Sequence, residues 1–340
     1  MTETRAVMKL KNLVIGYKRK RRKKREVAGP LNADLLSGEL ICLLGPNGSG
    51  KSTLIKTMAG MQAALSGNVF LSGSDMMHFT PKQTARKLST VLTDQILIGN
   101  LSVFTLVSLG RSPYTAWTGK LRPEDERATR QAIKSTGLGK LADRDVSTLS
   151  DGERQKVMIA RALAQDTDII LLDEPTAHLD LPNRVEIIRL LRKLTRQTGK
   201  AILLSTHELD LALKAGDKAW MLDNRGSLFA GVPEDLVLKG TFENVFERKS
   251  FNFDRATGSF KLHNPNGKKI SLKGDETAVF WTKRALEREG FGISEEAQKS
   301  VECLKSGNDY FWKLGSSRDD ELQSMGALIS ILRKERNVKS

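Results

Sequence analysis

The sequence predicts an α/β fold over residues 1–240, followed by a small α+β domain over residues 241–340. Strand-like and helix-like patterns alternate up to about residue 230, as in a sheet with helices packed on it. The near-continuous apolar run at 39–44 has the character of a central strand and leads directly into a glycine-rich turn. Across 231–245 this pattern gives way to shorter elements, which indicates a domain boundary there.

The first elements follow from local patterns taken in chain order. Residues 8–17 alternate apolar and polar side chains, as a half-buried edge strand does. Residues 52–60 favour a helix that follows the glycine-rich turn and ends at Gly60. Helical periodicity dominates 105–136, and within it 123–133 opens with a proline and acidic residues, which is typical of a helix N-terminus.

Three further elements complete the predicted α/β part. The apolar segments 169–172 and 201–206 indicate two more buried strands. Between them, the amphipathic pattern of 181–197 predicts a long helix. Asp180 is well placed as its N-cap, and Pro182 lies in its first turn.

The last hundred residues carry no motif to which chemistry can be assigned. Strand-like composition marks 259–263, 268–273, 277–281 and 309–314, and helical periodicity marks 282–290 and 320–335. The chemistry-bearing side chains here are scattered, and each is more typical of packing or of the surface than of a ligand set: His263, Trp281, Cys303 and Trp312.

Composition excludes several classes of protein. Cys42 and Cys303 are the only cysteines, so they cannot build a disulfide framework and are typical of a reducing cytosol. No apolar run approaches the ~20 residues that cross a bilayer, and the N-terminus lacks the apolar core of a secretory signal. We therefore expect a soluble chain. The net charge of +15 is uneven, because the run 18–25 alone carries eight positive charges, which argues against a protein that coats nucleic acid.

Residues 45–53 (GPNGSGKST) match the phosphate-binding pattern G-x-x-x-x-G-K-[ST] between a predicted strand and a predicted helix. The glycines let backbone amides turn toward phosphate oxygens, and the helix directs its positive N-terminus at the same anion. Lys51 can reach the β- and γ-phosphates, and the Ser52 hydroxyl can ligate Mg²⁺. The predicted nucleotide-binding residues of this loop are Gly45, Pro46, Asn47, Gly48, Ser49, Gly50, Lys51, Ser52 and Thr53.

Two carboxylates end the predicted strand at 169–172. Parallel strands deliver their C-terminal residues to the edge of the sheet at which a phosphate loop lies. Asp173 can then hold Mg²⁺, and Glu174 can orient or deprotonate the water that attacks the γ-phosphate. An acidic pair after a strand is more often a solvated turn, but its place downstream of a phosphate loop favours the catalytic role.

The segment 149–156 (LSDGERQK) lies between these two motifs and runs into a helix-like pattern. The order of phosphate loop, LSGGQ-like segment, DEP strand, Asp180 turn and His207 resembles the ABC-type ATPase superfamily, over about residues 6–235. The resemblance implies a P-loop NTPase fold with a mixed or parallel core sheet, an antiparallel β-subdomain and an α-helical subdomain. It also implies ATP and Mg²⁺ as the bound nucleotide and metal.

The LSGGQ-like segment departs from the family form at two positions, with Asp151 at a glycine and Glu153 at the glutamine. Ser150 and Gly152 are retained. A serine and a glycine amide at a helix N-terminus make an anion site. In the family this site closes on the γ-phosphate held by a second chain, so the resemblance implies a homodimer.

The resemblance also implies roles for four single residues. Gln95 matches the glutamine that senses Mg²⁺ and the attacking water, and His207 matches the histidine that bonds the γ-phosphate and braces Glu174. Asp180 matches the loop at the dimer interface, which is compatible with its capping role, and Tyr17 matches the aromatic residue that stacks on adenine. Taken alone, such a glutamine or histidine would be an ordinary surface or strand-end residue.

The chain has one phosphate loop, no long heptad tract between Lys51 and Ser150, and no fused membrane domain. These features argue against tandem ribosome factors, chromosome-structure proteins and fused exporters. Residues 101–117 resemble the segment T-V-x-x-x-V-x-x-G-R-x-P-[HY] of ATPases that power iron–siderophore, haem and cobalamin importers. The alternative is simply an amphipathic helix of the α-subdomain. This segment follows Gln95, in the part of the cassette that receives the permease in the family.

The resemblance therefore implies an ATP-hydrolysing subunit that couples hydrolysis to uptake of an iron chelate or a related metal chelate. Its partners would be integral-membrane permease subunits and, indirectly, a periplasmic or lipoprotein substrate-binding protein. It would lie peripherally on the cytoplasmic face of the inner membrane, with no specific nucleic acid bound. The alternative is a soluble ABC ATPase that acts on nucleic acid or protein assembly, favoured only by the run 18–25. A regulatory or dimer-stabilising role is expected for residues 241–340.

Overall fold

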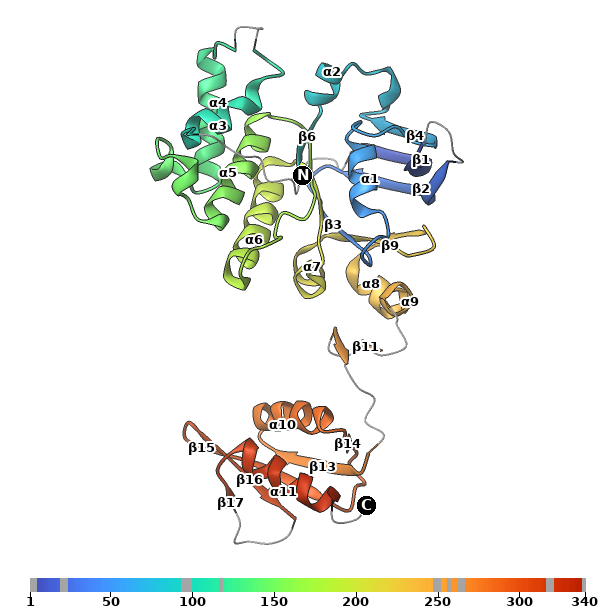
Figure 1. The fold of residues 1–340 in the computed structure, drawn as a ribbon, viewed down its shortest axis with the longest axis vertical. Coiled ribbons are helices and arrows are strands. Elements are labelled where there is room, and N and C mark those ends of the chain that lie inside the picture. The colour runs from blue at the N-terminus through green and yellow to red at the C-terminus, as the bar shows by residue number, and fades with distance from the viewer. Residues whose placement is uncertain are drawn as a thin grey trace. The chain divides into compact units, whose positions relative to one another are not determined.

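The computed structural model describes residues 5–18, 24–92, 100–115, 119–246, 252–255, 258–261, 267–315 and 321–337. The chain forms two compact units, residues 1–246 and residues 247–340 (Figure 1). The first unit extends past the predicted boundary at residue 240, because the helix α9 (Thr241–Phe246) buries Phe242 in it and packs with the preceding helix.

A six-stranded sheet forms the centre of the first unit. Its strands, in order across the sheet, are β10 (Leu228–Gly231), β9 (Lys218–Leu222), β3 (Leu40–Leu44), β8 (Ala201–Ser205), β7 (Ile169–Leu172) and β6 (Leu88–Val91). All neighbouring pairs are parallel except β10 with β9. Because the parallel strands β3, β7 and β8 are buried along their whole length, their sequences are continuous apolar runs rather than alternating ones.

A second, antiparallel sheet packs in the same unit, in the order β2-β1-β4-β5. Its strands are β1 (Ala6–Tyr17), β2 (Arg25–Leu36), β4 (Ser66–Leu71) and β5 (Ser74–Asp75). Helix α1 (Lys51–Met58) shares one hydrophobic core with both sheets, since Leu54 and Met58 are fully buried among residues of β1 and β3. The other helices near this core are η1 (Met76–His78), α2 (Pro81–Ala85), α6 (Leu181–Thr198), α7 (Leu209–Ala215) and α8 (Pro233–Leu238).

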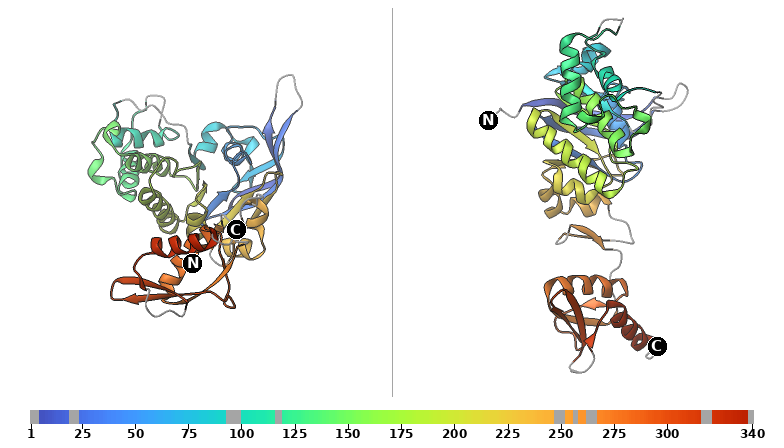
Figure 2. Two further views of the ribbon diagram at one scale, coloured as in Figure 1. Left: turned by 60° about the horizontal axis from the view of Figure 1, so that its bottom comes forward. Right: turned by 90° about the vertical axis from the view of Figure 1, so that its left-hand side faces the viewer.

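Helices form a separate flank of the first unit, opposite the antiparallel strands (Figure 1; Figure 2, left). They are α3 (Val103–Ser108), η2 (Leu109–Arg111), α4 (Pro123–Ser135), η3 (Gly139–Leu141), η4 (Val146–Thr148) and α5 (Asp151–Ala164). The α/β prediction with an antiparallel β-subdomain and an α-helical subdomain is confirmed. In the part of the chain that the structure describes, none of the helices has the length and apolar character that a bilayer span requires.

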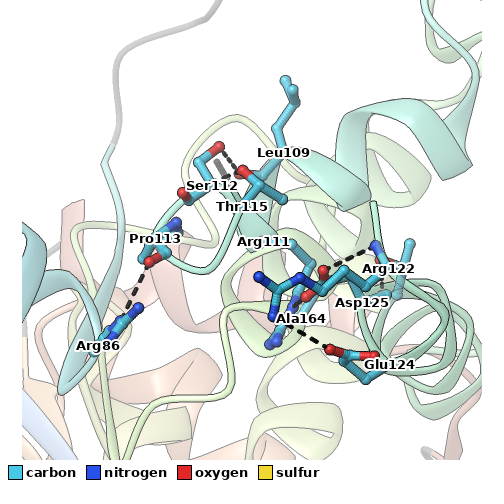
Figure 3. Close-up of polar contacts among 11 residues, drawn as sticks. Arg86, Leu109, Arg111, Ser112, Pro113, Thr115, Arg122, Glu124, Asp125 and Ala164 are labelled. Carbon is cyan, nitrogen blue, oxygen red and sulfur yellow. Dashed lines mark hydrogen bonds and ion pairs between the residues drawn. The ribbon is translucent and has the colours of Figure 1, made fainter. Parts of the chain in front are cut away.

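A buried arginine joins the helices of this flank (Figure 3). Arg111 Nε lies 2.9 Å from Asp125 Oδ1 of α4, and Nη1 donates to the carbonyl of Ala164, the last residue of α5, at 2.9 Å. The side chains of Arg111 and Asp125 are only 9% and 1% exposed. The guanidinium also lies over the Tyr114 ring, 4.0 Å from its centroid. One side chain therefore fixes α4, α5 and the turn after η2 as a single body.

The second unit contains a five-stranded sheet in the order β14-β13-β15-β16-β17. Its elements are β13 (Lys269–Gly274), α10 (Glu276–Arg288), β14 (Gly292–Ile293), β15 (Ser300–Ser306), β16 (Asp309–Leu314), β17 (Glu321–Leu322) and α11 (Met325–Asn337), and a separate hairpin pairs β11 (Asn252–Asp254) with β12 (Ser259–Lys261). Both helices contribute to its core, which includes Leu286 and Leu328.

The strand predicted at 277–281 is wrong, because this segment lies within α10. Its aromatic and β-branched composition suggested a strand, but Asp275 caps a helix by accepting a hydrogen bond from the Ala278 amide at 3.0 Å. The buried positions Ala278, Thr282 and Ala285 then recur at helical spacing.

Candidate active site

The phosphate-loop motif connects the end of β3 to the start of α1, as the sequence predicts. Gly45 and Gly50 have φ values of 155° and 108°. A Cβ atom at Gly45 would lie 2.3 Å from the carbonyl oxygen of Leu222, and one at Gly50 would lie 2.5 Å from Val27 Cγ1. Neither position accepts a side chain, so the loop stays tight against the sheet and brings its amides to the N-terminus of α1.

Two buried side chains of this loop fit a phosphate group. Lys51 Nζ donates to the carbonyls of Gly45 at 2.8 Å and Pro46 at 3.2 Å. Burial lowers the pKa of the Lys51 ammonium below its ordinary value, while the Glu174 and Asp173 carboxylates raise it. Ser49 Oγ is buried and has no hydrogen-bond partner among the residues that the structure describes. A phosphate oxygen would satisfy this hydroxyl and neutralise the ammonium.

Asp173 lies directly beside the phosphate loop, although more than a hundred residues separate the two in the sequence. Its Oδ1 accepts hydrogen bonds from Ser52 Oγ at 3.2 Å and from Ser205 Oγ at 2.7 Å. Carboxylate and hydroxyl oxygens are the ligands that Mg²⁺ prefers, usually completed by phosphate oxygens and water. The Ser52 hydroxyl and the Asp173 carboxylate lie 3.2 Å apart and are donors of the type that Mg²⁺ takes when it binds together with nucleotide phosphates.

Glu174 and His207 form a direct pair at the same edge of the sheet. His207 Nε2 lies 2.7 Å from Glu174 Oε1. The backbone of Glu174 has a φ of 50°, a conformation that costs a non-glycine residue ~1–3 kcal/mol. Ser205 supports it by accepting a hydrogen bond from the Glu174 amide at 2.9 Å. The ends of β3, β7 and β8 therefore bring together the predicted ammonium, metal-binding carboxylate, general base and histidine.

Ser205 is a residue of the site that no sequence motif indicates. Its hydroxyl contacts the carboxylate of Asp173 and the backbone of Glu174 at once. The signal available was weak, namely a fully buried serine at the polar end of an apolar strand. Such a residue needs hydrogen-bond partners in the interior, but the sequence does not say which ones.

Tyr17 lies at the end of β1, close to the phosphate-loop helix. Its hydroxyl forms a 3.0 Å hydrogen bond with Thr53 Oγ1, while the residue remains 47% exposed. The hydrogen bond ties the exposed ring to the start of α1. This placement fits the predicted stacking on an adenine ring, which needs an accessible aromatic face near the phosphates.

Ser150 and Gly152 lie at the N-terminus of α5, on the other flank of the unit from α1 (Figure 1). Glu153 Oε2 accepts hydrogen bonds from the Ser150 amide at 2.8 Å and from Ser150 Oγ at 2.9 Å. These two bonds hold the pKa of the Glu153 carboxyl below its ordinary value. Glu153, which stands where the family has glutamine, therefore still forms a reciprocal cap with Ser150 at the start of the helix. The capping side chain is a carboxylate in place of an amide.

The N-terminus of α5 at Gly152 lies against the N-terminus of α6, which Asp180 caps. A Cβ atom at Gly152 would lie 2.5 Å from Asn183 Oδ1, so the two helices approach closely there. Asp180 Oδ1 accepts a hydrogen bond from the Asn183 amide at 3.1 Å, which is the predicted N-cap contact. Gln95 and residues 19–23 of the basic run lie outside the described residues.

Comparison with known proteins identifies the two units. Residues 29–177 match the ABC transporter family, and residues 267–333 match the iron ABC transporter C-terminal domain. The chain is 35% identical over 258 residues to an uncharacterized ABC transporter ATP-binding protein of Methanocaldococcus jannaschii, across 76% of this chain and 87% of that one. It is 32% identical over 268 residues to the ferric enterobactin transport ATP-binding protein FepC of Escherichia coli, across 79% and 97%. The chain belongs to the ABC transporter ATP-binding proteins.

Solved structures of ABC transporters agree with this family. A transporter described as of the metal-chelate type, in an inward-facing conformation, has a TM-score of 0.62 and 26% identity, across 76% of this chain and 96% of that one. A dimeric ATP-binding cassette bound to ADP and phosphate has a TM-score of 0.56 and 28% identity, across 66% and 97%. The predicted ABC ATPase fold is confirmed, and the protein is an ATP-binding ATPase of this family.

Proposed function

We propose that this ABC ATPase powers the import of an iron chelate, such as a ferric siderophore, through separate integral-membrane permease subunits. The observation that carries this proposal is the second unit, which matches the C-terminal domain of iron ABC transporters beside a complete cassette. Relatives that transport ferric enterobactin and achromobactin support it. A relative named for cobalamin import in Halobacterium salinarum makes cobalamin the alternative cargo.

The working unit in this proposal is a head-to-tail homodimer at the cytoplasmic face of the membrane. Within one chain, helices α1 and α5 lie on opposite flanks of the first unit (Figure 1). A single chain therefore holds ATP at its phosphate loop, while Ser150 and Gly152 of the partner subunit approach the γ-phosphate. The dimeric cassette structure at 28% identity supports this arrangement. A substrate-binding protein would meet the permease and not this chain.

In the proposed reaction, water attacks the γ-phosphorus of ATP, a new P–O bond forms, and the bond to the β-phosphate oxygen breaks to give ADP and phosphate. Glu174 orients the water and accepts its proton, and His207 holds the Glu174 carboxylate in place. Lys51 and the loop amides stabilise the charge on the phosphate oxygens. Ser52, Asp173 and Gln95 would hold Mg²⁺. When bound, this ion would neutralise part of the phosphate charge.

We propose that the permease docks at a cavity of about 740 Å³ on the first unit. It is lined by the end of α1, the segment 61–69, η1, α2 and β6, and its lining includes Met61 and Met77, which are 55% and 82% exposed. Gln165, which follows α5, also lines it and donates to the carbonyls of Ala85 at 2.6 Å and Leu88 at 3.0 Å. An occupant would thus contact both the core and the helical flank.

The segment predicted for permease contact adjoins this cavity through α2. Arg86, which directly follows α2, donates to the Pro113 carbonyl at 3.2 Å (Figure 3). Its guanidinium lies over the Tyr114 ring at 5.3 Å from the ring centroid. Force applied in the cavity would therefore reach the turn that Arg111 joins to α4 and α5. A regulatory or dimer-stabilising role for the second unit stays a prediction.

Replacing Lys51 by alanine should abolish uptake of a radiolabelled ferric siderophore in cells that depend on this protein, because the variant loses its main contact with the phosphates. Lys193→Ala, at an exposed position of α6, is the matched control and should retain uptake. Uptake that persists in Lys51→Ala cells would refute the proposed function. Loss of cobalamin uptake, with ferric siderophore uptake intact, would correct the cargo.

A double change to aspartate at Met61 and Met77 should lower recovery of the permease in a detergent pull-down by about ten-fold, since two charges enter an apolar contact. ATPase activity of the isolated protein should remain within about two-fold. Leu238→Asp, at a 73% exposed position on α8, is the control. Undiminished recovery would exclude the cavity, and recovery of ribosomes or nucleic acid in place of a permease would support the alternative function that the basic run 18–25 favours.

A further inference from the structure

The side chain of Arg184 contacts two turns of the active site, namely the turn before α6 and the turn after β8. Arg184 lies in the first turn of α6, where its amide donates to the Asp180 carbonyl at 2.9 Å. Its Nε donates to the carbonyl of Leu179 at 2.6 Å, and its Nη1 forms an ion pair with Glu208 Oε1. The two side chains of this ion pair are about one third exposed, so the guanidinium is partly withdrawn from solvent.

The two turns that Arg184 joins carry two of the predicted site residues, Asp180 and His207. Leu179 directly precedes Asp180, which matches the loop that the family resemblance places at the dimer interface. Glu208 directly follows His207, and its backbone starts α7 by accepting a hydrogen bond from the Ala212 amide at 2.9 Å. The fork of one guanidinium therefore fixes the turn after β8 against the turn before α6.

His207 needs such a support, because packing does not hold its ring. The His207 side chain is 43% exposed, and its ring contacts Glu174 at 2.7 Å. A displacement of about 1 Å between catalytic groups can cost on the order of a hundred-fold in rate. A planar guanidinium with donors in two fixed directions sets a distance between two turns, whereas a lysine ammonium acts as a point charge.

We propose that Arg184 is a positioning residue for ATP hydrolysis, which acts through Glu208 to place the His207 ring against Glu174. It touches neither the nucleotide nor the attacking water. Because its second contact is the carbonyl before Asp180, it also makes the placement of His207 depend on the turn at the proposed dimer interface. This inference rests on the proposed roles of His207 and Glu174.

The first test is the steady-state ATPase kinetics of the full-length variants Arg184→Gln and Arg184→Lys. We expect kcat to fall by about 10- to 100-fold in both, with the Kd for ATP within about two-fold of wild type. Glu208→Gln should reproduce the effect, since it removes the charge that the guanidinium contacts. Arg189→Gln, at an exposed position on the same helix, is the matched control. An unchanged kcat in soluble Arg184→Gln, or an equal loss of ATP affinity, would overturn the proposal.

The second test separates positioning from a general structural role. In a His207→Ala background there is no ring to place, so adding Arg184→Gln should lower kcat by less than about two-fold further. Fully additive losses would show that Arg184 acts elsewhere and would overturn the proposal while leaving the role of His207 intact. If His207→Ala alone keeps wild-type kcat, the role assigned to His207 fails, and the Arg184 proposal fails with it.

Discussion

Glu174→Gln should lower kcat for ATP hydrolysis by about 10²- to 10⁴-fold, the usual contribution of a general base. The amide has nearly the shape of the carboxylate and can keep a hydrogen bond to His207, but it cannot accept a proton from water. ATP affinity should stay within about three-fold, because the phosphates are held by the loop that starts α1 and not by this side chain. Single-turnover hydrolysis and equilibrium titration with ATP measure the two quantities separately.

The same variant should accumulate as an ATP-bound dimer, since the step that reopens the dimer follows hydrolysis in the proposed cycle. Size-exclusion chromatography with ATP and Mg²⁺ gives the oligomeric state, and omission of ATP gives the monomer reference. Glu186→Gln is the matched control, because Glu186 lies on the exposed side of α6, where it pairs with Lys156 at 2.6 Å. A Glu174→Gln protein that turns over as fast as this control would contradict the assignment of the base.

The parts of the site that the sequence predicted are those determined by short local patterns. The motif 45–53 implies a tight loop wherever it occurs between a strand and a helix, and the structure has β3 and α1 at these positions. Asp173 and Glu174 follow a buried strand, and parallel strands end at one edge. These rules are sufficient to bring the carboxylates to the phosphate loop, because they depend on topology and not on side-chain detail.

The contacts that the sequence did not predict depend on packing between distant segments. Ser205 and Arg184 act through partners 24 to 32 residues away in the sequence, and no local pattern encodes such pairs. Arg111 appears in the sequence as part of a motif, yet its burial follows from α4 and α5 closing around it. The helix predicted at 282–290 matches the second half of α10, but its first half was predicted as a strand for a similar reason: which face of 277–281 is buried is decided by the sheet that α10 packs on.

Arg111→Ala should lower the free energy of unfolding of the first unit by about 3–5 kcal/mol, because it leaves the Asp125 carboxylate buried and unpaired. For a unit of this size the melting temperature should fall by roughly 6–20 °C, which calorimetry on the nucleotide-free protein can measure. Arg127→Ala, at an exposed position of α4, should change the free energy by less than about 0.5 kcal/mol. Replacing the buried pair together, as Arg111→Met with Asp125→Leu, should cost much less than Arg111→Ala alone.

The loss caused by Arg111→Ala should also depend on pH. Burial opposes ionisation of Asp125, but hydrogen bonds from the Arg122 amide and the Arg111 guanidinium outweigh it and hold the pKa of this carboxyl below its usual value. The stabilisation is therefore fully present above the unfolded-state pKa of about 4 and is lost as the pH falls through the lower pKa of the folded protein. The difference in stability between wild type and Arg111→Ala should be constant near neutrality and shrink below about pH 4. A difference that grows in acid, or one no larger than that of Arg127→Ala, would mean that the buried ion pair does not hold this flank together.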